Sequence, residues 1–209
     1  MADKFNNRYR ISSTRLQSWD YAKNGLYFVT ICTKNNEHYF GEIIDGEMQL
    51  SQIGEIVESE WIKTFEMRPD MNLRMDEYVV MPNHFHAIII IGENRYNTHC
   101  GNAMPCRDAM HCRDAMHCVS TTTTAQTVIP ITQPKLNQFG RQSKNLSSVI
   151  RGFKIGVTKN ARILDPDFEW QSRFYDHIIR DSKSLKKIQD YIFNNPLQWK
   201  DDKYNNLKT

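Results

Sequence analysis

The triplet His84-Phe85-His86 is the feature of this sequence best suited to chemistry. It opens an apolar run that ends at Ile91 and that predicts a β-strand. Alternate side chains of a strand share one face, so both imidazoles are expected to point the same way. Two such nitrogens suit the chelation of one divalent metal ion. The alternative is a pair of histidines on a half-exposed strand that bind nothing.

A second candidate lies near the C-terminus, where residues 182–195 predict an amphipathic helix that Pro196 ends. Its apolar stripe consists of Leu185, Ile188 and Ile192. On the helical period, Tyr191 lies at the edge of this stripe and Asn195 lies near it, one turn later. A buried amide needs a partner, and a metal ion held by the two histidines would be one. Alternatively, Tyr191 is a core residue and Asn195 caps the helix.

The identity of a third metal ligand stays open at this point. Asn195 precedes a proline, which biases it away from helical geometry, so Asn194 is an alternative. His177, within the segment FYDHIIR, is either a further ligand or a histidine of the core.

The elements that must position these residues follow from periodicity and turn signals. Strands are expected at 25–32, 73–80, 84–91 and within 170–180, and Asp45-Gly46 predicts a tight hairpin within 39–50. Helices are expected at 52–66, with Ser51 as N-cap, at 144–162 and at 182–195. This order fits a ferredoxin-like two-layer α+β sandwich, in which helices pack on one face of an antiparallel sheet.

The length of 209 residues predicts a single domain over the whole chain. Residues 1–24 are expected to form an N-terminal arm, and residues 93–135 a low-complexity surface insertion. This insertion holds a six-residue tandem repeat whose cysteines, at positions 100, 106, 112 and 118, are six apart. That spacing is not a usual zinc pattern, so a repeat-expanded insertion is favoured over a metal site.

Composition excludes several classes of protein. Apolar residues make up 40% and charged residues 24% of the chain, which is typical of a globular protein. The longest apolar run, from Ala87 to Ile91, is too short to cross a membrane. The N-terminal segment lacks the apolar stretch of a secretory signal, and a cytoplasmic location is therefore expected.

Charge is distributed unevenly along the chain. Residues 135–209 carry 15 Lys and Arg against 8 Asp and Glu, whereas residues 1–92 carry 9 against 13. A basic C-terminal third fits a polyanionic partner, although a solvated basic face is the alternative. The candidate phosphate-binding side chains are Arg8, Arg10, Arg15, Arg151, Lys154, Arg173 and Arg180. Trp19 and Trp170 could stack on unpaired bases.

Four segments together resemble the REP-associated tyrosine transposases, a group within the single-tyrosine HUH nucleases, whose name denotes a His–hydrophobe–His motif. The matching segments are WDYAKNGLYFVTICTKN, EYVVMPNHFHAIIII, WQSRFYDHIIRD and YIFNNP. They occur in the family's order and span most of the chain outside residues 93–135. The resemblance implies a ferredoxin-like fold, in agreement with the order of elements above.

The resemblance also implies roles for residues. It makes Tyr191 the nucleophile, His84 and His86 metal ligands, and Asn195 the third ligand, with Mg²⁺ or Mn²⁺ as the ion. The implied activity is nicking and rejoining of single-stranded DNA that carries a small hairpin of the REP type, through a covalent 5′-phosphotyrosine. The alternative is a DNA hairpin-binding module of the same fold that does not cleave. The sequence leaves open whether the protein is a monomer or a homodimer.

Overall fold

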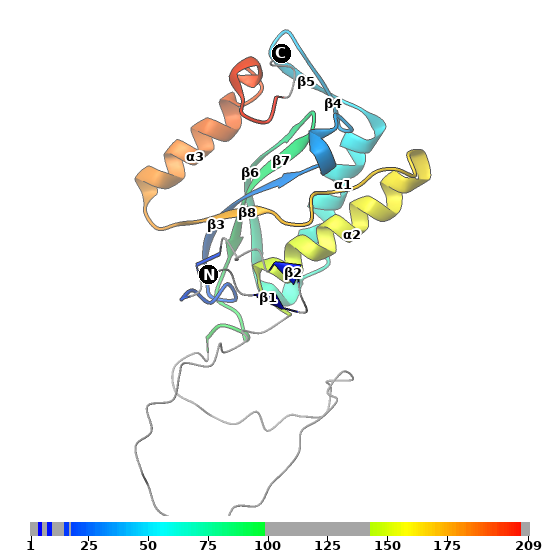
Figure 1. Ribbon diagram of the computed structural model, residues 1–209. Coiled ribbons are helices and arrows are strands. Elements are labelled where there is room, and N and C mark those ends of the chain that lie inside the picture. The colour runs from blue at the N-terminus through cyan, green and yellow to red at the C-terminus, as the bar shows by residue number, and fades with distance from the viewer. Residues whose placement is uncertain (1–3, 6–7, 10–14, 17, 99–142, 206–209) are drawn as a thin grey trace, which may run out of the picture.

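The protein, seen in a computed structural model, is built around a four-stranded antiparallel sheet (Figure 1). The structure describes residues 4–5, 8–9, 15–16, 18–98 and 143–205. The strands are β3 (Gly25–Cys32), β6 (Leu73–Met81), β7 (His84–Ile91) and β8 (Tyr175–Ile179), in the spatial order β6-β7-β3-β8. The helices are α1 (Gln52–Glu66), α2 (Leu146–Leu164) and α3 (Ser182–Asn194).

The first six of these elements follow each other as β3-α1-β6-β7-α2-β8. This βαββαβ order, with every neighbouring pair of strands antiparallel, is the ferredoxin-like arrangement. The expected fold class is therefore confirmed. The predicted bounds of β3, α1 and β7 agree with the structure, and α2 is shifted by two residues at both ends.

Local signals explain where these elements begin. Ser51 caps α1, since its side chain accepts a hydrogen bond of 3.1 Å from the backbone N–H of Gly54. Before α1, the strands β4 (Gly41–Ile44) and β5 (Glu47–Leu50) form the expected hairpin. Its turn residues, Asp45 and Gly46, both have positive φ, which is the geometry that Asp-Gly favours.

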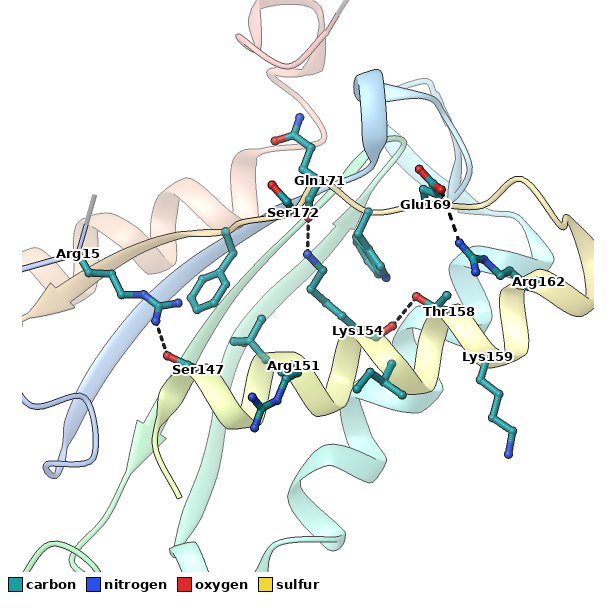
Figure 2. A pocket seen from close by; sticks show the side chains of 14 residues that line it. Arg15, Ser147, Arg151, Lys154, Thr158, Lys159, Arg162, Glu169, Gln171 and Ser172 are labelled. Carbon is teal, nitrogen blue, oxygen red and sulfur yellow. Dashed lines mark hydrogen bonds and ion pairs between the residues drawn. The ribbon is translucent and has the colours of Figure 1, made fainter. Parts of the chain in front are cut away.

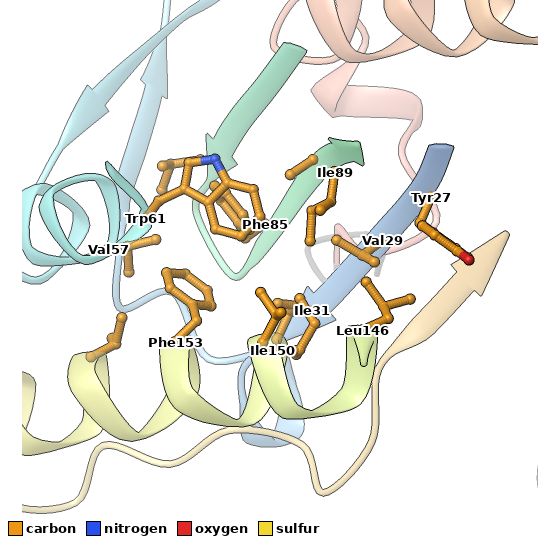
Figure 3. Close-up of a cluster of buried hydrophobic side chains, with 14 of the residues drawn as sticks. Tyr27, Val29, Ile31, Val57, Trp61, Phe85, Ile89, Leu146, Ile150 and Phe153 are labelled. Carbon is orange, nitrogen blue, oxygen red and sulfur yellow. The ribbon is translucent and has the colours of Figure 1, made fainter. Parts of the chain in front are cut away.

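Two amphipathic helices cover one face of the sheet. Figure 3 shows how side chains of α1 and α2 interlock with alternate residues of β3 and β7. Phe85, in the middle of the His84-Phe85-His86 triplet, packs against Trp61 of α1 and Phe153 of α2, with ring centroids 4.9 Å and 5.4 Å apart. This core fixes β7 in register and so turns both histidines to the opposite face.

Helix α3 packs on that opposite face (Figure 1). Its cluster contains Phe28, Ile88, Ile179 and Ile192. The expected packing of helices on one face is thus confirmed for α1 and α2, but α3 lies on the other face. The physical reason is that β3 and β7 are apolar on both faces, so the second face also needs cover.

The remaining expectations concern the ends and the insertion. The arm contains two short paired strands, β1 (Lys4–Phe5) and β2 (Arg8–Tyr9). Most of the insertion, including the cysteine repeat, lies outside the described residues. Among the described residues, no helix is long and apolar enough to span a membrane.

Candidate metal centre and tyrosine site

The two histidines of the triplet converge on one point. His84 and His86 lie on the same face of β7, as predicted, and both are buried. Their Nε2 atoms are 3.0 Å apart. Two ligands at right angles on one ion, each about 2.1 Å from it, are also about 3.0 Å apart. The pair therefore has the spacing of two adjacent ligands at right angles on one divalent ion.

Neighbouring side chains hold both rings in place through the other nitrogen. Nδ1 of His84 is 2.8 Å from Oδ1 of Asn83, and Nδ1 of His86 is 2.8 Å from Oγ1 of Thr30. Thr30 lies directly opposite His86 on β3. Partners of this kind at Nδ1 fix the ring orientation and leave Nε2 as the ligand atom.

Burial keeps both imidazoles neutral at neutral pH. Desolvation lowers the pKa of His86 to about 3, and the charge of Lys203 contributes in the same direction. Desolvation lowers the pKa of His84 well below its ordinary value, and the neighbouring His86 is the second largest cause of this shift. A neutral imidazole offers a lone pair, so both Nε2 atoms are available to a cation.

Asn195 provides a buried oxygen that lacks a partner. The residue is 1% exposed, and its Oδ1 has no hydrogen-bond partner among the described residues. Its Nδ2 is 3.4 Å from Oδ2 of Asp202. An unsatisfied buried acceptor is costly, and a cation would satisfy it. The unpaired amide oxygen therefore fits a site that binds a cation better than it fits an apolar core.

The two alternative third ligands do not join this cluster. Asn195 keeps helical backbone angles at the end of α3 (φ −58°, ψ −42°) although a proline follows, so it remains on the inner side of the helix. Asn194 instead donates a hydrogen bond of 2.7 Å to the carbonyl of Asp190. His177 is exposed on β8 and is neither a core residue nor near the pair.

Asp202 is a site residue that the sequence analysis missed. It follows the short 3-10 helix η3 (Trp199–Asp201) and is 9% exposed. Ligand atoms of His84, His86 and Asp202 all lie within 4.8 Å of one another, so this group could hold a metal ion. The local sequence WKDDKY has no periodicity that points inward, and only the return of the chain over the sheet brings Asp202 to the histidines.

The segment after α3, residues 196–205, carries Asp202 and is called the tail here; it also covers the histidines. The ring of Tyr204 lies over His84, with centroids 4.5 Å apart. The Tyr204 carbonyl accepts a hydrogen bond of 2.8 Å from Nδ2 of Asn83, the residue that orients His84. These contacts tie the tail to the start of β7.

Tyr191 lies beside the histidine pair, at the edge of the apolar stripe of α3. Its Oη is 3.2 Å from Nε2 of His86, and its ring meets Phe28 edge-on. The side chain is 37% exposed, so it is not a core residue. Burial and the charge of Asp202 raise its pKa, while a hydrogen bond with Asn195 and the charge of Lys203 oppose this rise.

A cavity of about 410 Å³ opens over this group. It is lined on the sheet side by Phe28, Thr30, His86 and Tyr175, and on the other side by α3 and the tail. Tyr191, His86, Asn195 and Asp202 therefore line one space that is accessible from solvent.

The predicted DNA-binding side chains are only partly brought together. Arg15, Arg151 and Lys154 line one cavity of about 690 Å³ with Trp170 (Figure 2). Arg180 lies 5.9 Å from the ring centroid of Trp19, beside a different cavity.

Three other candidates are in neither group. Arg173 is exposed just before β8. Arg8 belongs to β2, but its side chain is outside the described part, as is Arg10 altogether. For all seven candidate residues the DNA contacts stay predictions.

Comparisons with known proteins give one relative and one fold. No protein-family model matches the chain. A Haemophilus influenzae protein described as "Uncharacterized protein" is 37% identical over 194 residues, covering 91% of this chain and 90% of its own. A solved structure of a REP-associated tyrosine transposase bound to a REP hairpin has a TM-score of 0.53 and 20% identity. That match covers 90% of this chain and 74% of the transposase. The chain belongs to one family with the Haemophilus influenzae protein, and it has the fold of a REP-associated tyrosine transposase.

Proposed function

We propose that the protein is a metal-dependent single-stranded DNA endonuclease and strand transferase that uses Tyr191 as its nucleophile. The observation that carries the proposal is that the Tyr191 hydroxyl lies 3.2 Å from Nε2 of His86, which is itself 3.0 Å from Nε2 of His84. Tyr191 and His86 line one cavity together with Asn195, whose buried Oδ1 lacks a partner among the described residues. A nucleophile next to an array of neutral metal-binding atoms suits attack on a phosphodiester.

In the proposed reaction, Oη of Tyr191 forms a bond to phosphorus and the bond from phosphorus to the 3′ oxygen breaks. The 5′ phosphate stays on the tyrosine and the 3′ oxygen takes up a proton. The tyrosine proton is lost on attack and the 3′ oxygen takes one up, so protons balance. Burial and the charge of Asp202 raise the pKa of Tyr191 and oppose this loss, whereas the charge of Lys203 favours it. The covalent phosphotyrosine conserves the bond energy, so a 3′ hydroxyl can later reverse the step.

His84, His86, Asn195 and Asp202 would hold the divalent cation. When bound, Mg²⁺ or Mn²⁺ would polarise the phosphate and stabilise charge on its oxygens. Imidazole ligands favour Mn²⁺ at least as much as Mg²⁺, which prefers oxygen. Thr30 and Asn83 would act as positioning residues, since each holds the Nδ1 of one histidine.

The proposed substrate is single-stranded DNA with a hairpin of the REP type. The solved transposase of the same fold is bound to such a hairpin, and the basic C-terminal third of this chain fits a polyanion. The proposal concerns one protomer and applies equally to a monomer or a homodimer.

A denaturing-gel assay tests the mechanism. Labelled single-stranded DNA from the repeats that flank the gene would be mixed with protein and Mn²⁺, Mg²⁺ or a chelator. We expect a metal-dependent labelled adduct that resists denaturant and disappears in Tyr191→Phe. Tyr175→Phe is the matched control, because Tyr175 lines the same cavity and is 53% exposed; it should retain the adduct.

Two results would contradict this mechanism. Cleavage without an adduct, unchanged in Tyr191→Phe, would indicate a nuclease that uses water. Tight binding of the hairpin without cleavage in any metal would indicate the non-cleaving DNA-binding module.

A further inference from the structure

The larger cavity on the other side of the sheet edge is not used by the mechanism above. It lies between α2 and residues 169–174, the segment that leads into β8 (Figure 2). Among its lining residues, five are cationic and one is acidic. The cations are Arg15, Arg151, Lys154, Lys159 and Arg162, and the acid is Glu169. Glu169 is paired with Lys34 and Arg162, and Arg15 is paired with Asp176, which does not line the groove. Five cations against one carboxylate still give the lining a net positive charge.

Apolar and aromatic surface lies among these cations. Ile155 is 62% exposed although it lines the groove, and Trp170 and Phe174 contribute rings. The guanidinium of Arg15 lies 4.6 Å from the ring centroid of Phe174. An exposed apolar side chain bordered by cations is suited to a ligand with a flat apolar part and negative charges, as a nucleotide is.

Lys154 is held in the groove in a defined position. Its ammonium donates a hydrogen bond to the carbonyl of Gln171 and lies 5.8 Å from the ring centroid of Trp170. Burial lowers the pKa of Lys154 to about 8. A phosphate next to this ammonium would stabilise its charged form, because an opposite charge compensates for desolvation.

The groove and the tyrosine cavity meet at one strand. Phe174 lines the groove and Tyr175, the next residue, lines the tyrosine cavity. Successive side chains of an extended chain point to opposite faces, and β8 is the edge strand of the sheet. A single strand of DNA could therefore pass from one cavity to the other around this edge.

We propose that the α2 groove, formed by the lining residues named above, binds an unpaired segment of the DNA strand whose phosphodiester is attacked at Tyr191. An unpaired base packs its apolar face against Ile155 beside the ring of Trp170, and the cations of α2 contact the adjoining phosphates. This inference rests on the proposed function, since it extends the path of the same strand beyond the tyrosine cavity.

The test compares Ile155→Glu with Ile163→Glu. Both are exposed isoleucines of α2, but Ile163, at 78% exposure, does not line the groove. Binding of labelled oligothymidylates of about 6 and about 20 nucleotides would be measured by fluorescence anisotropy. In Ile155→Glu we expect affinity for the longer strand to fall about tenfold or more, since apolar contact with the base is lost and a carboxylate faces phosphate. Ile163→Glu should bind as the wild type does.

Two further readouts locate the strand. In wild-type protein, 5-iodouracil placed along the longer oligonucleotide should photo-crosslink to Trp170, as mapped by mass spectrometry. Lys154→Gln should reduce the slope of log affinity against log salt concentration by about one, which corresponds to the loss of one phosphate contact.

The outcomes separate this proposal from the proposed function. If the Tyr191 adduct forms but Ile155→Glu binds both oligonucleotides like Ile163→Glu, the groove proposal is overturned and the mechanism stands. If the long strand crosslinks in the groove but no adduct forms, the groove is supported and the mechanism fails. Binding of anionic phosphatidylglycerol vesicles instead of DNA, lost in Ile155→Glu, would identify a membrane contact and overturn the proposal.

Discussion

The buried imidazole of His86 should make the metal-free protein less stable as the pH falls. Its pKa is about 3 in the folded protein and about 6.5 in an unfolded chain. Between these pH values the unfolded state binds a proton at His86 that the folded state does not bind, so acid favours unfolding. The stabilisation is complete above about pH 6.5 and is lost as the pH falls towards about 3.

The size of the effect follows from this difference in pKa. Each pH unit well below about 6.5 costs about 1.4 kcal/mol for one such group. Going from about pH 7 to about pH 5 should therefore lower the free energy of unfolding by about 2 kcal/mol through His86. His84, whose pKa is also lowered, adds to the loss in the same direction.

Urea denaturation in a chelator, at a series of pH values, measures this contribution. The loss of stability between about pH 7 and about pH 5 should be smaller by about 2 kcal/mol in His86→Gln than in the wild type. His177→Gln is the control, since His177 is exposed on β8, and it should keep the wild-type dependence. Identical pH dependence in His86→Gln and the wild type would refute the reasoning, because it would mean that His86 is protonated equally in both states.

Further predictions concern the metal centre and the β-hairpin formed by β4 and β5. Asp202→Asn should weaken binding of Mn²⁺ about tenfold or more in isothermal titration calorimetry, because a carboxylate beside the histidines is lost; unchanged affinity would exclude Asp202 as a ligand. Thr30→Val should weaken Mn²⁺ binding by about 10- to 100-fold, since Nδ1 of His86 loses its partner; an unaltered dissociation constant would show that Thr30 does not position the ring. Gly41→Ala should lower the free energy of unfolding by more than about 1 kcal/mol, because φ is 135° and a Cβ would lie 2.0 Å from the Gln49 carbonyl; equal urea midpoints for variant and wild type would contradict this.

Local patterns were sufficient to predict most elements of this fold. The run from Gly25 to Cys32, the capped helix that begins after Ser51 and the Asp45-Gly46 turn depend on interactions between near neighbours in the chain. The order of these elements then restricts the topology to a few solutions. The side on which α3 packs could not be predicted in this way, because the central strands are apolar on both faces and accept a helix on either.

The same distinction between local patterns and tertiary packing applies to the candidate site. The sequence by itself determined that His84 and His86 share a face, since alternation is a property of any strand, and that Tyr191 and Asn195 lie one turn apart. Only the tertiary structure decided that these two pairs meet, because the packing of α3 on the sheet sets the 3.2 Å between Oη of Tyr191 and Nε2 of His86. Asp202 likewise reaches the histidines through the return of the chain after α3, a long-range contact that no local pattern encodes.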